Sequence, residues 1–147
     1  MENRAPGRGL LKVTGILYII IAVLEIIGAI LVLTGGGLSM AVGGEMYESF
    51  TMVMGAGLII MGVVSLVQGI FGLIMGILGV KNSDKPEKAG VCMVLGIIVI
   101  ALGAIGLIMD FMGWADTSAI IGGLVGLIIP VLYTVGAVKN KNAAAGM

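Results

Sequence analysis

Glu25 is the residue whose type and setting point most directly to chemistry. It interrupts a continuous apolar run, and an ionisable side chain inside a membrane is costly to place and is by default a functional candidate. Ser65 and Gln68 lie in the next apolar run, at a similar depth when helical residues are counted at about 1.5 Å each. The three side chains are therefore predicted to form a hydrogen-bonded cluster.

Two roles for these residues stay open. A neutral carboxyl group at Glu25 can donate a hydrogen bond, exchange a proton or take up a cation, which would couple the protein to ion movement. Alternatively, the polar side chains hold membrane helices together, each contact contributing about 0.6–2 kcal/mol. No second acid or base lies deep in an apolar run to complete a proton relay.

Little else in the sequence could do chemistry. There is no histidine, and the one cysteine, Cys92, is interpreted as a small packing residue. No acid–base pair, nucleophile beside a base or phosphate-binding loop is visible, so we expect no enzyme, catalytic residue, cofactor or metal site. A few scattered lysines do not indicate nucleic-acid binding.

Four apolar runs must position these residues. They cover about 10–34, 51–80, 89–109 and 120–138, and each can cross a hydrocarbon core of roughly 30 Å as a helix. Only 11% of the residues are charged, against roughly 25% in soluble domains, so lipid must be the main solvent and partner. The prediction is an all-α, four-helix transmembrane domain covering residues 1–147.

Charge placement predicts the orientation. All eight basic residues fall outside or at the ends of the runs, on one side of the membrane: Arg4, Arg8, Lys12, Lys81, Lys85, Lys88, Lys139 and Lys141. The positive-inside rule then places both termini in the cytoplasm of a multi-pass cell-membrane protein. The opposite side carries acids interpreted as solvated loop charges and two interfacial aromatic residues, namely Glu45, Glu48, Asp110, Asp116, Tyr47 and Trp114.

Small residues recur at helical spacing. The second run has glycine every seven residues, with a neighbouring row three positions on, and the third run has a similar row. The predicted packing positions are Gly55, Gly62, Gly69, Gly72, Gly76, Gly96 and Gly103. A seven-residue repeat predicts a left-handed bundle in which glycine lets helix backbones approach closely. A pore lined by glycine is the alternative reading.

The chain also resembles two tandem helical hairpins. The segment from Gly9 matches the segment from Gly90, with Gly15 aligned to Gly96 and Ala22 to Gly103. The second and fourth runs end in the related motifs GVKN and AVKN. Both copies would begin on the same side of the membrane, which predicts a parallel repeat.

Local signals refine the helix boundaries. Asp84 and Glu87 have the spacing of a capping box, and Pro86 suits the first turn of a helix. Pro130 should kink the fourth run or free a carbonyl group. The polar tail KNKNAAAGM is expected to be frayed.

Taken whole, the pattern of glycine-rich runs joined by a short charged turn, GILGVKNSDKPEKAGVCMVLGIIVIALG, resembles the uncharacterised small four-helix membrane proteins of Gram-positive bacteria. That resemblance implies a fold and no activity. The segment VLEIIGAIL from Val23 is similar to the first-helix glutamate region of small multidrug-resistance transporters, which implies Glu25 as a proton and substrate site. The third-helix motif of that family has no counterpart here, and the charge bias is too one-sided for an antiparallel dimer.

Two functions are therefore expected. The first is a non-enzymatic protein of four spans that acts as a scaffold or complex subunit, packing with a second copy or with another membrane protein. The alternative is a small proton- or cation-coupled transporter or channel that uses Glu25.

Overall fold

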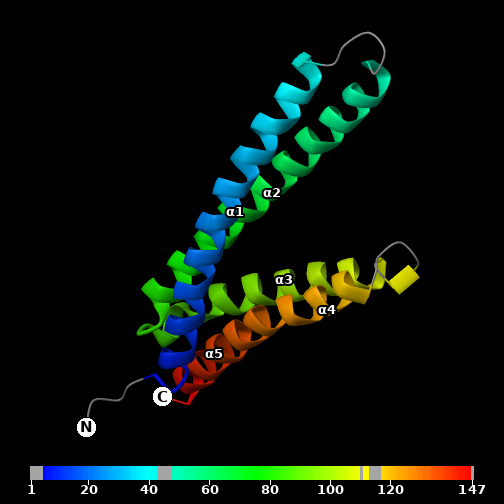
Figure 1. The fold of residues 1–147 in the computed structure, drawn as a ribbon. Helices are drawn as coiled ribbons and strands as arrows, with labels where there is room; N and C mark the ends of the chain where they lie inside the picture. Colours follow the sequence, from blue (N-terminus) through cyan, green and yellow to red (C-terminus); the bar gives the residue numbers. More distant parts are fainter. Residues whose placement is uncertain (1–4, 43–47, 110, 113–116, 147) are drawn as a thin grey trace. The chain divides into compact units, whose positions relative to one another are not determined.

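The computed structural model describes residues 5–42, 48–109, 111–112 and 117–146, and these contain no strand. The described elements, drawn in Figure 1, are α1 (Arg8–Val42), α2 (Glu48–Asn82), the short 3-10 helix η1 (Pro86–Lys88), α3 (Ala89–Met109), α4 (Thr117–Gly126) and α5 (Ile128–Ala145). The expected all-α fold is confirmed.

Four helical segments are long and apolar enough to cross a membrane, as the sequence predicted. They are Arg8–Leu38, Met52–Asn82, Pro86–Ile108 and Ile120–Ala145. Large apolar side chains point outward along them, for example Leu24 at 64% exposure and Ile60 at 65%, which suits a lipid solvent. The expected frayed tail was wrong, because α5 continues through three alanines, which are strong helix formers, to Ala145.

Contacts between residues group the chain into two compact units. Unit 1 contains Met1–Tyr18 and Met75–Met147, and unit 2 contains Ile19–Ile74. The helices α1 and α2 contribute to both units, and each unit is described separately below.

Unit 2 is an antiparallel pair of helices in contact through glycine. A β-carbon added to Gly69 would lie 2.8 Å from Ile26 Cγ1 and 3.3 Å from the Ala22 carbonyl oxygen. One added to Gly62 would lie 2.6 Å from Leu33 Cγ and 3.3 Å from the carbonyl oxygen of Ala29. We call these contacting positions, Ala22, Ile26, Ala29 and Leu33 on α1 with Gly62 and Gly69 on α2, the α1–α2 seam. A side chain at Gly62 or Gly69 would force Leu33 or Ile26 of α1 to move.

Unit 1 uses the same kind of contact. A β-carbon on Gly15 would lie 2.9 Å from the carbonyl oxygen of Gly76, so the start of α1 touches the end of α2 through backbone. One on Gly136 would lie 2.9 Å from the backbone nitrogen of Leu11, which brings α5 against α1. Backbone atoms at this separation gain dispersion contacts that larger side chains would prevent.

The aligned positions of the predicted repeat make equivalent contacts. In the first copy Gly15 faces Gly76; in the second, a β-carbon on Gly96 would collide with the hydroxyl of Thr134, which aligns with Gly76. Likewise Ala22 and Gly69 are in contact in the first copy, and they align with Gly103 and Leu127 in the second. A β-carbon added to Gly103 would lie 2.6 Å from Leu127 Cδ2. The pairing of α3 with α4 and α5 thus repeats the register of α1 with α2.

Pro130 shapes the fourth span. The helix is interrupted at Leu127, between α4 and α5, three residues before the proline. A proline ring clashes with the carbonyl group four residues earlier and has no N–H for it, so the Gly126 carbonyl loses its usual partner. The Leu127 N–H is shared between the carbonyl oxygens of Gly123 and Leu124, at 3.2 and 3.3 Å. The break agrees with the effect expected of Pro130.

Replacing Gly69 with leucine should destabilise the α1–α2 seam by about 1–3 kcal/mol, the usual cost of overpacking a close contact. The measurement is the free energy of unfolding in detergent. Gly57→Leu is the matched control, because Gly57 is exposed on the same helix and an added β-carbon there meets nothing within 4 Å. Equal stability of the two variants would show that the Gly69 face is not packed.

Candidate functional site

Glu25 lies beside the α1–α2 seam. It follows Ala22 by three residues and precedes Ala29 by four, and both of these alanines are almost fully buried. Residues at that spacing share one side of a helix, so the carboxyl group stands at the edge of the seam, where it is half-buried. A position at the edge leaves Glu25 reachable by a helix from outside the pair.

Ser65 and Gln68 lie on the same side of unit 2 as Glu25. Ser65 follows Gly62 by three residues, as Glu25 follows Ala22, and equivalent positions of two antiparallel helices flank the same side of their contact. Gln68 directly precedes Gly69, so it stands about 100° around α2 from the contacting row. Ser65 is half-buried and Gln68 is exposed. The register of the seam also places Glu25 and Gln68 at nearly the same level.

These three residues do not form the predicted hydrogen-bonded cluster. None of the side-chain hydrogen bonds found among the described residues joins Glu25, Ser65 and Gln68. Glu25 and Gln68 lie at a similar level along the pair, but Gln68 stands about 100° around α2 from the contacting row. The structure therefore leaves a polar edge on unit 2, defined by Glu25, Ser65 and Gln68.

The second copy of the repeat lacks this polar edge. The positions that align with Glu25, Ser65 and Gln68 are Gly106, Gly123 and Gly126. An added β-carbon at Gly106 or Gly126 meets nothing within 4 Å, so those glycines do not hold the second pair together. Because the second pair adopts the same register without polar residues, the polar edge is not needed to bring α1 and α2 together.

A buried polar network closes one end of unit 1. The side chain of Asn140 is fully buried; its Oδ1 accepts a hydrogen bond from the Gly7 N–H at 2.7 Å, and its Nδ2 donates to the Ser83 carbonyl oxygen at 2.9 Å. One side chain of α5 thus joins the start of α1 and the turn after α2. Asn140 satisfies two backbone groups that would otherwise be buried without partners.

Tyr133 and Cys92 extend this packing. The Tyr133 hydroxyl donates to the Met75 carbonyl oxygen at 3.0 Å, and its ring meets the Tyr18 ring edge-on with centroids 5.5 Å apart. Cys92 is buried, its thiol 3.6 Å from the Leu78 carbonyl oxygen, in keeping with a packing role. Asn82 donates to the Cys92 sulfur at 3.9 Å.

The turn between α2 and α3 differs in detail from the sequence expectation. Pro86 begins η1 as predicted, but the N-cap residue is Lys85 and it makes no side-chain capping bond. Asp84 instead forms an ion pair with Arg8 on α1. The N-cap lies one residue after Asp84, so the capping-box spacing of Asp84 and Glu87 does not apply here.

The other predicted residues are placed as follows. Gly55, Gly62, Gly69, Gly76 and Gly96 are buried, and Gly72 and Gly103 are half-buried. Glu45, Tyr47, Asp110, Trp114 and Asp116 lie outside the described residues, as does the side chain of Glu48. Among the residues that the structure describes, no group of three acidic, histidine or cysteine side chains is placed to hold a metal ion.

Sequence reasoning missed Asn140, although a signal for it existed. Asn82 and Asn140 end the two related motifs GVKN and AVKN, and both side chains are buried, at 6% and 0% exposure. A buried asparagine repeated at the end of two apolar runs indicates a hydrogen-bonded position in the packed interior rather than a solvated tail.

No family model matches the chain, and neither a curated protein nor a solved structure matches it. The functional argument therefore depends on the geometry of the two units.

Asn140→Ala should lower the free energy of unfolding by about 1–3 kcal/mol, because the Gly7 N–H and the Ser83 carbonyl are left buried without partners. Unfolding in detergent, followed by circular dichroism, measures the change. Asn142→Ala on the same helix is the control, since Asn142 is exposed and should contribute little. Equal stability of the two variants would contradict the role given to Asn140.

Proposed function

We propose that the protein is a non-enzymatic membrane subunit whose polar edge, Glu25, Ser65 and Gln68, binds a helix from outside the α1–α2 pair. The observation that carries this proposal is the half-buried Glu25 at the edge of the seam, with Gln68 exposed beside it on the same side. The partner is a second copy of the chain or another membrane protein.

The cost of polar groups in hydrocarbon supports the proposal. A carboxyl or amide group that faces lipid lacks hydrogen-bond partners, so a helix that supplies them is bound more tightly. The second copy of the repeat forms its pair with glycine at all three aligned positions, so this polar set offers no advantage to pairing itself. The polar residues therefore stabilise a contact with a helix outside the pair.

Cross-linking tests this directly. In a Cys92→Ala background, Gln68→Cys should form a disulfide or bridged adduct in native membranes, because Gln68 is exposed on the bound side. Ile70→Cys is the control on the opposite side of α2, about 160° around the helix from Gln68, where 48% exposure predicts no adduct. A dimer of this chain identifies self-association, and a heavier adduct identifies the partner by mass spectrometry.

Adding Glu25→Ala to the Gln68→Cys variant should lower the adduct yield by about threefold to twentyfold, the value of one to two membrane hydrogen bonds. Leu24→Ala is the matched control, because Leu24 neighbours Glu25 and is 64% exposed. Equal labelling at Gln68→Cys and Ile70→Cys, or no adduct at either, would reject the packing role. The coupling of Glu25 to proton or cation movement would then be the better account.

We also propose that this protein resides in the cell membrane with both termini in the cytoplasm. The basic residues at the ends of α1, α2 and α5 support this orientation through the positive-inside rule. A reporter active only in the cytoplasm, fused after Asn142, should be active, while an export-dependent reporter at the same place should be silent. The reverse pattern would overturn the orientation.

A further inference from the structure

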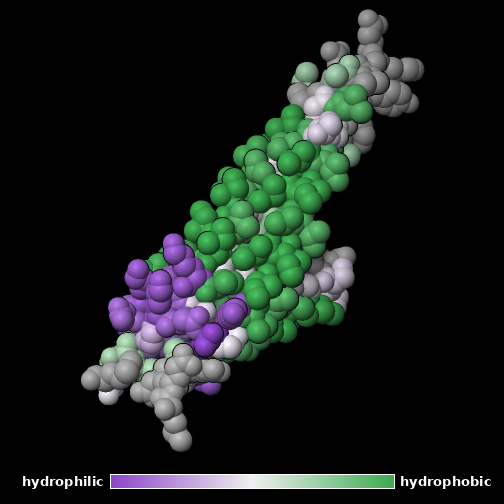
Figure 2. Space-filling model, turned by 90° about the vertical axis from the view of Figure 1, so that its left-hand side faces the viewer, coloured by the Kyte–Doolittle hydropathy of each residue, from purple (hydrophilic) through white to green (hydrophobic). Residues whose placement is uncertain are grey.

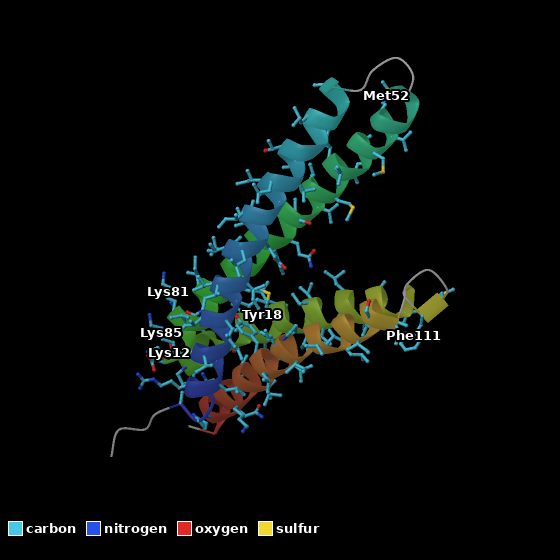
Figure 3. All side chains as sticks on the ribbon, viewed as in Figure 1. Lys12, Tyr18, Met52, Lys81, Lys85 and Phe111 are labelled. Carbon is cyan, nitrogen blue, oxygen red and sulfur yellow. The ribbon has the colours of Figure 1, made fainter. Side chains whose placement is uncertain are left out.

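Three lysines from separate elements gather at the end of unit 1. Figure 3 shows Lys12 on α1, Lys81 on α2 and Lys85 in the following turn on one side of this end. Figure 2 shows the same region as a hydrophilic patch that adjoins an apolar surface. All three side chains are exposed.

Two contacts fix the spacing of these lysines. One turn before Lys12, Arg8 pairs with Asp84, which directly precedes Lys85. One turn after Lys12, a β-carbon on Gly15 would lie 3.0 Å from the backbone nitrogen of Val80, which directly precedes Lys81. The three lysines therefore lie on packed helices and the turn that follows α2, and not on a chain terminus.

Their charge is not compensated within the described part of the chain. Asp84 is already engaged by Arg8, and neither Asp84 nor Glu87 forms an ion pair with Lys12, Lys81 or Lys85. Three ammonium groups close together repel one another, and an anion between them relieves that repulsion. The site therefore favours a ligand with negative charge.

Apolar side chains lie one helical turn from two of the three lysines. Ile16 is one turn from Lys12 towards the middle of α1 and is 44% exposed, and Ile77 is one turn from Lys81 on α2 and is 49% exposed. Residues four apart share a helix face, so Lys12 and Lys81 each lie at the end of an apolar column. Lysine stems can extend along such columns while the charged ends reach the headgroup region.

We propose that Lys12, Lys81 and Lys85 form a binding site for the phosphate group of an anionic phospholipid in the adjacent leaflet. The ammonium groups bind the phosphate, and the columns below, which include Ile16 and Ile77, contact the acyl chains. A soluble phosphate would gain the charge contacts but not the apolar ones, which is why the site is assigned to a lipid. The site is separate from the polar edge of unit 2 and does not depend on its function.

The test uses the full chain in nanodiscs made from equal parts of phosphatidylcholine and phosphatidylglycerol. Native mass spectrometry after mild delipidation counts the phosphatidylglycerol retained. The triple variant Lys12→Gln, Lys81→Gln and Lys85→Gln should retain at least about tenfold less, since a lysine near a membrane surface contributes about fivefold in affinity for anionic lipid.

The matched control changes the same amount of charge at the same end of unit 1. It is the triple variant Lys88→Gln, Lys139→Gln and Lys141→Gln, in which all three replaced side chains are exposed on η1 and α5. It should retain phosphatidylglycerol as the wild type does. Equal loss in both triple variants would show diffuse attraction and overturn the site, as would no loss in either.

Two further arms complete the test. Inorganic phosphate added to the nanodiscs should not displace the lipid, and displacement would overturn the lipid assignment in favour of a soluble anion. Replacing the same three lysines with arginine keeps the charge and should preserve binding. If the glutamine triple variant loses its helical signal, the single variants replace it, each expected to weaken binding about fivefold. No loss in any of them would reject the proposal.

Discussion

Close approach of helix backbones at glycine is the interaction on which the rest of this structure depends. Lipid is as apolar as a leucine side chain, so burying leucine against leucine gains little in a membrane. What helices gain instead is dispersion between atoms in contact, and that grows as the backbones come closer. At Gly62 and Gly69 in unit 2, and at Gly15 and Gly136 in unit 1, an added β-carbon would lie 2.6–2.9 Å from atoms of the facing helix.

This packing explains why the polar groups occupy so few places. A seam made of glycine and alanine leaves no room for a polar side chain at its centre, so Glu25 and Ser65 stand at its edge. The polar contacts that do stabilise unit 1 are found at its end, where Asn140 and Ser83 join three segments. A buried amide there satisfies backbone groups that are left free wherever a helix begins or ends.

The sequence predicted those features that depend on local pattern. Continuous apolar runs gave the four helices, Pro130 gave the interruption at Leu127, and the seven-residue spacing marked Gly62 and Gly69. It could not predict which distant residue would pair with a given side chain. Asp84 and Glu87 have the capping-box spacing, but the N-cap is Lys85, one residue later, and the Asp84 carboxylate pairs with Arg8 on another helix. Depth along a helix was likewise predictable for Gln68, whereas its rotation depends on which face of α2 packs, and a single residue turns that face by about 100°.

The tandem repeat separates what the fold requires from what this chain has added. Gly15 and Ala22 in the first copy align with Gly96 and Gly103 in the second, and all four are small residues at helix contacts. Packing therefore dictates these positions. The copies differ where the first has Glu25, Ser65 and Gln68 and the second has only glycine. Because the second pair forms with glycine at these positions, a carboxylate is not needed for α1 to pair with α2. Desolvation of that carboxylate also costs free energy. The difference between the copies therefore supports the proposal that these three residues serve an interaction outside the α1–α2 pair.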